Sequence, residues 1–228
     1  MVIHTPAIVL KSFSYGESSI IARCFSREQG KISLIIKGAK RSKSPKSVHF
    51  QPLSYVELIY NYQPKRDLQT ISKVSFLGYW SKILSNLRSI TLSMAILEIT
   101  DKALSHQDPY PSLFSTLVDV FQEFDKDKIN PNILFWFYEC ALLQNLGFKP
   151  DLGISHFPGI VLPDIHKNKK TISLLSILLS GDIKKLPKNE IKYEDSKIIS
   201  SYLWTLLKYH CENLNNVKFK KVIRKILN

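Results

Sequence analysis

The chain has 228 residues, 44% of them apolar, which is enough for one or two folded domains with a hydrophobic core. No stretch approaches the ~20 consecutive apolar residues of a membrane span, and the first residues lack signal-peptide character, so we expect a cytoplasmic protein without membrane contact. A formal net charge of +13, from 32 basic and 19 acidic residues, indicates a polyanionic partner.

Residues 1–78 read as short β-strands separated by turns. We expect strands at 7–14, 20–26, 31–37, 53–62 and 68–77. In the third strand Ile32, Leu34 and Ile36 alternate with polar positions, and this period of two places Lys31 and Lys37 on the face away from the core. Five short strands without a helical period predict a small barrel, either an OB-fold or an SH3-like barrel.

From about residue 79 the apolar period becomes helical, which predicts a mainly α-helical domain over 79–228. Its clearest helix has Asn130 as N-cap, Pro131 at the first position and Gly147 after the last turn. Residues 133–146 are apolar nearly all round, so this helix is expected at the centre of the domain. Its core residues would include Trp136, Phe137, Cys140 and Leu143.

The remainder of the helical domain is less regular. Residues 148–170 lack sustained periodicity and predict an irregular insertion between helices. A short apolar segment follows at 172–179, a long helix is expected around 199–210, and the tail 218–228 is basic and amphipathic.

The densest functional signal is a basic loop, residues 37–46, between the third and fourth predicted strands. It contains five cations and no acid, together with serine hydroxyls suited to phosphate oxygens. Such a loop can follow a sugar-phosphate backbone without reading bases, although a solvated loop has the same composition. Arg23 and Lys11, which lie within strands, would extend the basic surface if they face outward. The cations of the loop are Lys37, Lys40, Arg41, Lys43 and Lys46.

Single-strand binders add aromatic side chains on which bases stack. The predicted barrel offers several candidates, of which about half are expected in its core. They are Phe13, Tyr15, Phe25, Phe50, Tyr55, Tyr60 and Tyr62.

Catalytic signatures are missing, which favours a binding protein over an enzyme. The sequence has no Walker A loop, no Gly-x-Gly-x-x-Gly and no Gly-x-Ser-x-Gly. A two-metal nuclease needs clustered carboxylates, but the acidic residues of 1–78 are widely separated. His156 and His166 flank Asp164 without a common zinc spacing, so we expect surface histidines.

Several segments, in order and spacing, resemble the RecO family of recombination mediators. The resemblance spans about residues 7–152 and ends at a hallmark that follows the central helix. It is carried by Ile8-Val9-Leu10-Lys11, Tyr15-Gly16-Glu17-Ser18, Gly30-Lys31, the run from Lys37 to Ser44, Gln51-Pro52-Leu53 and Gly147-Phe148-Lys149-Pro150-Asp151-Leu152.

The resemblance implies an α+β protein with an N-terminal five-stranded OB-fold and a mainly α-helical domain behind it. It implies binding and annealing of single-stranded DNA, with double-stranded DNA as a further ligand, and loading of RecA onto strands coated by the single-strand binding protein SSB. The implied partners are RecR and the acidic C-terminal tail of SSB. The implied DNA surface is Arg23, Lys31, Lys37, Lys40, Arg41, Lys43 and Lys46.

One feature departs from the family pattern. Many members carry a four-cysteine zinc site after the Gly-Phe-x-Pro segment, whereas residues 153–170 contain no cysteine, and the three cysteines elsewhere form no Cys-x-x-Cys. We therefore expect no zinc ribbon and no cofactor. Two alternatives stay open at this stage: an RNA-binding OB-fold protein, and a nuclease whose carboxylates come from distant segments.

Overall fold

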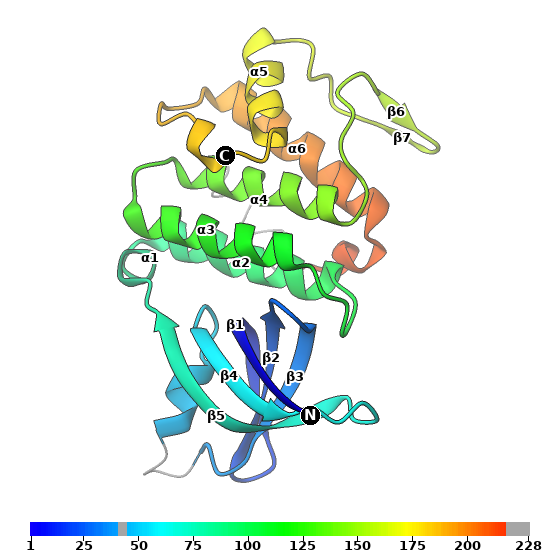
Figure 1. Cartoon of the computed structure of the whole chain (residues 1–228). Coiled ribbons are helices and arrows are strands. Elements are labelled where there is room, and N and C mark those ends of the chain that lie inside the picture. The colour runs from blue at the N-terminus through cyan, green and yellow to red at the C-terminus, as the bar shows by residue number, and fades with distance from the viewer. Residues whose placement is uncertain (41–44, 218–228) are drawn as a thin grey trace. The chain divides into compact units, whose positions relative to one another are not determined.

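A computed structural model describes residues 1–40 and 45–217 (Figure 1). The chain forms two compact units. One comprises residues 1–79 together with 100–115, and the other comprises 80–99 together with the chain from 116 onward. Residues 100–115, which the sequence pattern places in the helical region, thus group with the strands.

The first unit is a closed barrel of five strands in the order β1-β2-β3-β5-β4, with β4 pairing back onto β1. All pairings are antiparallel except that of β3 with β5, which is parallel. This topology confirms the predicted OB-fold and excludes the SH3-like alternative. The strands are β1 Val2–Tyr15, β2 Ser19–Ser26, β3 Gly30–Ile36, β4 Tyr55–Asn61 and β5 Leu68–Gly78, and a 3-10 helix, η1, covers Pro45–Phe50.

A bulge in β1 reverses which side chains face the barrel interior. Ala7 and Val9 belong to the core, but the register with β2 shifts between Val9 and Lys11. Beyond the shift Ser12 pairs with the core residue Ala22. Because directly opposed residues point to the same side of a sheet, the alternate positions Lys11, Phe13 and Tyr15 face outward.

The second unit is mainly helical. Figure 1 shows α4 with α2 and α3 on one side and α5 and α6 on the other. The helices are α1 Ser81–Ser85, α2 Leu87–Ala103, α3 Pro111–Lys126, α4 Pro131–Asn145, α5 Lys169–Leu179 and α6 Tyr193–His210; the short elements are β6 His156–Phe157, β7 Ile160–Val161, η2 Ile183–Lys185 and η3 Glu212–Asn216.

The predicted limits of the central helix are confirmed. The Asn130 side chain accepts a hydrogen bond from the Asn132 amide at 3.0 Å, and Gly147 has a φ of +86°. Every residue from 132 to 143 is buried, including the four that the sequence assigns to the core. The predicted insertion at 148–170 contains the β6–β7 hairpin and the start of α5, which Asn168 caps.

Candidate nucleic-acid interface

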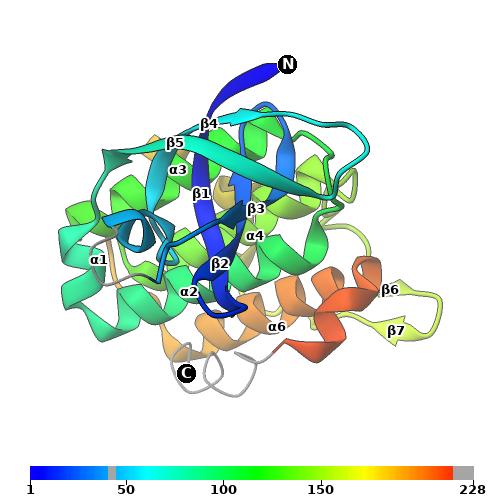
Figure 2. The same cartoon turned by 90° about the horizontal axis from the view of Figure 1, so that it is seen from below.

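The outer face of β1, β2 and β3 is the candidate interface. These strands lie side by side at the barrel surface (Figure 2). Beyond the bulge, Phe13 and Tyr15 stand on this face and are 46% and 52% exposed. Ile21 on β2 pairs with Phe13, and Ile35 on β3 pairs with Ile21, so a strip of half-buried apolar side chains continues from Phe13 across the sheet.

Hydrogen bonds hold the beginning of the basic loop beside Phe13 and Tyr15. The Lys40 amide donates to the Ser18 carbonyl, and the Lys40 ammonium donates to the Gly16 carbonyl, both at 3.0 Å. These acceptors belong to the turn that directly follows Tyr15. Lys37 and Lys40 are exposed, and so is Lys46, which lies in η1. Arg41 and Lys43 lie outside the described residues.

The other five aromatic candidates have different surroundings. Phe25, Phe50 and Tyr60 are fully buried. Tyr55 and Tyr62 are half-buried, and the Tyr62 hydroxyl is 3.4 Å from the Gln107 side chain. The exposed pair on the candidate interface is therefore Phe13 and Tyr15, which we call the aromatic platform.

Lys31 is less accessible than the other described cations of the predicted DNA surface. It stands on the face away from the barrel core, as predicted, but it is not at the protein surface, because residues 101–107 cover it. Its ammonium donates to the backbone carbonyl of Asp101 and lies 3.8 Å from the Asp101 carboxylate. The Gln107 amide donates to the Lys31 carbonyl at 3.0 Å. A DNA contact by Lys31 remains an untested prediction that this burial disfavours.

Arg23 shares the same carboxylate. One terminal nitrogen of Arg23 is 3.1 Å from an Asp101 oxygen, and the Lys11 ammonium is 2.7 Å from the other. Lys11 and Arg23 are paired residues of β1 and β2. We call Lys11, Arg23, Lys31 and Asp101 the Asp101 cluster; it occupies the outer barrel face at the opposite end of the aromatic platform from the basic loop.

Burial and charge compete in this cluster. Burial raises the pKa of the Asp101 carboxyl, but hydrogen bonds from Lys11 and Arg23 and the positive charge of both outweigh burial, so the pKa lies below its usual value. Burial lowers the pKa of Lys31; Asp101 opposes this effect, and the charges of Arg23 and Lys11 add to it. Asp101 is therefore held as a carboxylate.

Two exposed cations escaped the sequence prediction. Lys65 and Arg66 lie in the β4–β5 loop, one of the loops that border the ligand face of an OB-fold. The buried side chain of Gln69 braces this loop, accepting from the Gln63 amide and donating to the Gln63 carbonyl, both at 2.9 Å. The signal available in the sequence is a Lys-Arg pair in a Pro-containing turn between two predicted strands.

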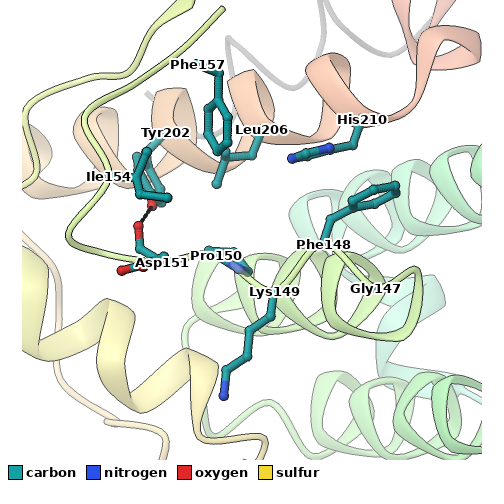
Figure 3. Close-up of a pocket in the computed structure, with 10 residues that line it drawn as sticks. All are labelled: Gly147, Phe148, Lys149, Pro150, Asp151, Ile154, Phe157, Tyr202, Leu206 and His210. Carbon is teal, nitrogen blue, oxygen red and sulfur yellow. Dashed lines mark hydrogen bonds between the residues drawn. The ribbon is translucent and has the colours of Figure 1, made fainter.

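The helical unit contains a separate cavity of about 210 Å³ between the Gly147–Asp151 hallmark and α6 (Figure 3). The Phe148 ring stacks on the His210 imidazole with centroids 4.1 Å apart. Phe157 contributes a further apolar wall, and Lys149 is the lining cation. Burial lowers the pKa of His210, which favours its neutral form. The cavity suits an apolar side chain.

Residues 1–40 and 45–217 include no group of three or more His, Cys, Asp or Glu side chains that could hold a metal ion. His156 and His166 are exposed, which confirms them as surface residues.

The Asp125 carboxylate has a structural role in the helical unit. It accepts a hydrogen bond from the Lys82 amide at 2.8 Å and so caps α1. Each helix in the described part of the chain is too short or too polar to cross a lipid bilayer.

Comparison with known proteins gives a consistent answer over both units. Residues 1–80 match the family described as the N-terminal part of recombination protein O, and residues 84–154 match the corresponding C-terminal part. The chain belongs to the RecO family. The two matches together cover the barrel and the helical region up to the hallmark segment.

Individual RecO-family relatives agree. The chain is 32% identical over 149 residues to the DNA repair protein RecO of Salinibacter ruber and 32% identical over 152 residues to that of Exiguobacterium sibiricum. These regions cover 65% and 67% of this chain but only 57% and 60% of the relatives, less than two thirds of their length. The protein of the same name from Christiangramia forsetii is 25% identical over 240 residues, 99% of both chains.

Proposed function

We propose that this chain is a DNA repair and recombination mediator that binds single-stranded DNA on the outer face of its OB-fold. It anneals complementary strands and helps to load RecA onto strands coated by SSB. It works by binding alone, without a catalytic step and without a cofactor. Its place of action is the cytoplasm, at the nucleoid.

The observation that carries this proposal is the exposed aromatic platform with cations at its side. Phe13 and Tyr15 offer two flat apolar surfaces to bases, and Lys37 and Lys40 stand beside the turn that follows Tyr15. Base stacking on aromatic side chains is tolerant of sequence, and lysine contacts to phosphates release counterions. The combination favours unpaired strands, whose bases are free to stack.

The proposed partners are single-stranded DNA, double-stranded DNA, RecR and the acidic C-terminal tail of SSB. For the tail, we propose the cavity beside α6, because its wall includes Phe148, Phe157 and Leu206 and because Lys149 supplies a positive charge. An apolar cavity with a cation at its rim is suited to a short acidic peptide with apolar side chains.

The test is fluorescence anisotropy of a labelled single strand at several salt concentrations, with annealing of SSB-coated complementary strands measured in parallel. Lys37→Glu/Lys40→Glu should weaken binding, flatten the salt dependence and slow annealing. The control is Lys184→Glu/Lys185→Glu, which changes the net charge equally at exposed positions of the helical unit. Equal effects of both variants would show that only overall charge matters, which contradicts the proposed surface.

An RNA-binding role is the alternative, since the same platform and cations accept either polymer. Strands of identical sequence in DNA and RNA form separate the two. We expect tighter binding of DNA and annealing of DNA; a clear preference for RNA would replace the proposed function.

A further inference from the structure

The Asp101 cluster contains more positive charge than its own structure neutralises. Three cations, Lys11, Arg23 and Lys31, surround one carboxylate that is 8% exposed. Lys31 is buried against the backbone of Asp101, whereas the Lys11 and Arg23 side chains are 46% and 33% exposed. The uncompensated charge therefore lies on the side of the cluster that solvent reaches.

Hydrogen-bond donors are also in excess there. A guanidinium has five N–H groups and an ammonium has three. Arg23 reaches Asp101 through one terminal nitrogen, and its Nε, which is buried, finds no acceptor among the described residues. A carboxylate and a phosphate present oxygens to a guanidinium in a similar way. The Asp101 carboxylate thus occupies a position in which a phosphate would be bound.

We infer that Lys11 and Arg23 form a second phosphate site on the barrel, and that Asp101 competes with DNA for it. This inference rests on the proposed function and assigns a regulator to the same surface. Asp101 occupies the two cations in the free protein, and a strand gains them only by displacing the carboxylate. Asp101 thereby limits how tightly the chain holds DNA, which suits a protein that must release strands after they pair.

The position of the cluster supports a continuous path. Lys11, Phe13 and Tyr15 succeed one another on the outer side of β1, about 6.6–6.8 Å apart. A strand whose phosphate lies between Lys11 and Arg23 has its next bases over the aromatic platform and then reaches Lys40 beside the Gly16 turn.

The test uses Lys31→Met/Asp101→Asn. This pair of changes leaves the net charge of the protein unchanged, because one cation and one anion are removed together. It also avoids leaving the buried Lys31 ammonium without its acid. With Lys11 and Arg23 released, single-strand affinity at low salt should rise at least about fivefold. The slope of log affinity against log salt should steepen by roughly 1 to 1.5, or about 0.7 for each new contact.

The control adds Lys11→Gln/Arg23→Gln to this variant and should cancel both gains; a gain that persists would show that it does not come from these cations. If wild type binds DNA and the folded Lys31→Met/Asp101→Asn variant matches it in affinity and slope, the competition is refuted while the proposed function stands. If wild type binds no strand, the proposed function fails; binding by the variant would then still support competition, and no binding by either would refute both.

A second variant tests the same idea should the first not fold. Ser33 lies directly opposite Arg23 on β3 and is half-buried on the outer face. Ser33→Lys places another cation beside Arg23 to share the Asp101 carboxylate, which leaves one more cation for phosphate; it should tighten strand binding and steepen the slope by about 0.7. An unchanged slope would overturn the inference.

Discussion

Gly30 and Asp108 are in backbone contact: a Cβ atom on residue 30 would overlap the Asp108 carbonyl oxygen. Gly30 also has a φ of +62°, in the left-handed region that disfavours side chains. Its neighbour Lys31 accepts a hydrogen bond from Gln107. The start of β3 therefore holds residues 100–108 against the barrel, and these residues carry Asp101.

Gly30→Ala should lower the free energy of unfolding by about 2–4 kcal/mol, because it adds left-handed strain to a backbone collision. Urea unfolding measures this loss. The matched control is Gly16→Ala, at a φ of +56° with nothing within 4 Å of the added Cβ, where only strain of about 1–2 kcal/mol is expected. Equal losses in the two variants would contradict the contact.

Phe13→Ala/Tyr15→Ala should weaken single-strand binding by about 1–3 kcal/mol for each lost base contact, while the salt slope stays unchanged because no cation is removed. Anisotropy titrations at several salt concentrations measure both quantities. Tyr79→Ala removes a 73% exposed aromatic side chain elsewhere in the barrel unit and should leave affinity as it is. An unchanged affinity in this variant would show that the platform does not contact bases.

Asp101 should make stability depend on pH in the acid range. Its pKa is lowered in the folded state, so its stabilising contribution is complete above the unfolded value of about 3.9 and is lost as pH falls through the folded value. Asp101→Asn should cost about 2 kcal/mol at pH 7. The difference from wild type, measured by urea unfolding, should shrink below about pH 4. A gap that stays constant down to pH 2 would be inconsistent with this carboxylate.

Ile154→Glu should weaken binding of an acidic, apolar peptide to the helical unit by more than about tenfold, because it places a like charge at the mouth of the cavity. Anisotropy of a labelled peptide is the measurement, and single-strand binding should be unaffected. Val161→Glu adds the same charge at an 83% exposed position outside the cavity and should have little effect. If both variants bind the peptide equally well, the tail binds elsewhere.

Tyr60→Phe should leave the barrel equally stable or stabilise it by up to about 1 kcal/mol. The Tyr60 hydroxyl is buried, and no described residue accepts or donates a hydrogen bond to it. Burial is the main reason that its pKa rises to about 12. Removing an unsatisfied buried hydroxyl eliminates a desolvation cost. A clear loss of stability in thermal unfolding would reveal a partner for the hydroxyl.

Local patterns sufficed for much of the fold. The alternation of Ile32, Leu34 and Ile36 predicts β3, because each apolar side chain meets the same core. Asn130 and Gly147 predict the ends of α4 through backbone chemistry that involves only neighbouring residues. Such signals depend only on residues within a few positions of one another, so they can be recognised without the tertiary structure.

The Asp101 cluster could not be predicted from local sequence patterns. Lys31 follows the outward alternation of its strand, yet its partner is 70 positions away and arrives through the fold of residues 100–108. No periodicity in the sequence predicts that contact. The exposure of Phe13 and Tyr15 depends in the same way on the β1 bulge, which is visible only in the pairing register with β2.

That bulge gives a single strand two separate duties. Residues before the bulge contribute side chains to the barrel core, and residues after it face outward toward the proposed ligand. One inserted residue therefore separates a structural part of the strand from a ligand-binding part. Regular pairing along the whole of β1, without the bulge and with Leu10 retained, would turn the aromatic platform inward. Substitutions before the bulge should therefore change the melting temperature, and substitutions after it should change the DNA affinity.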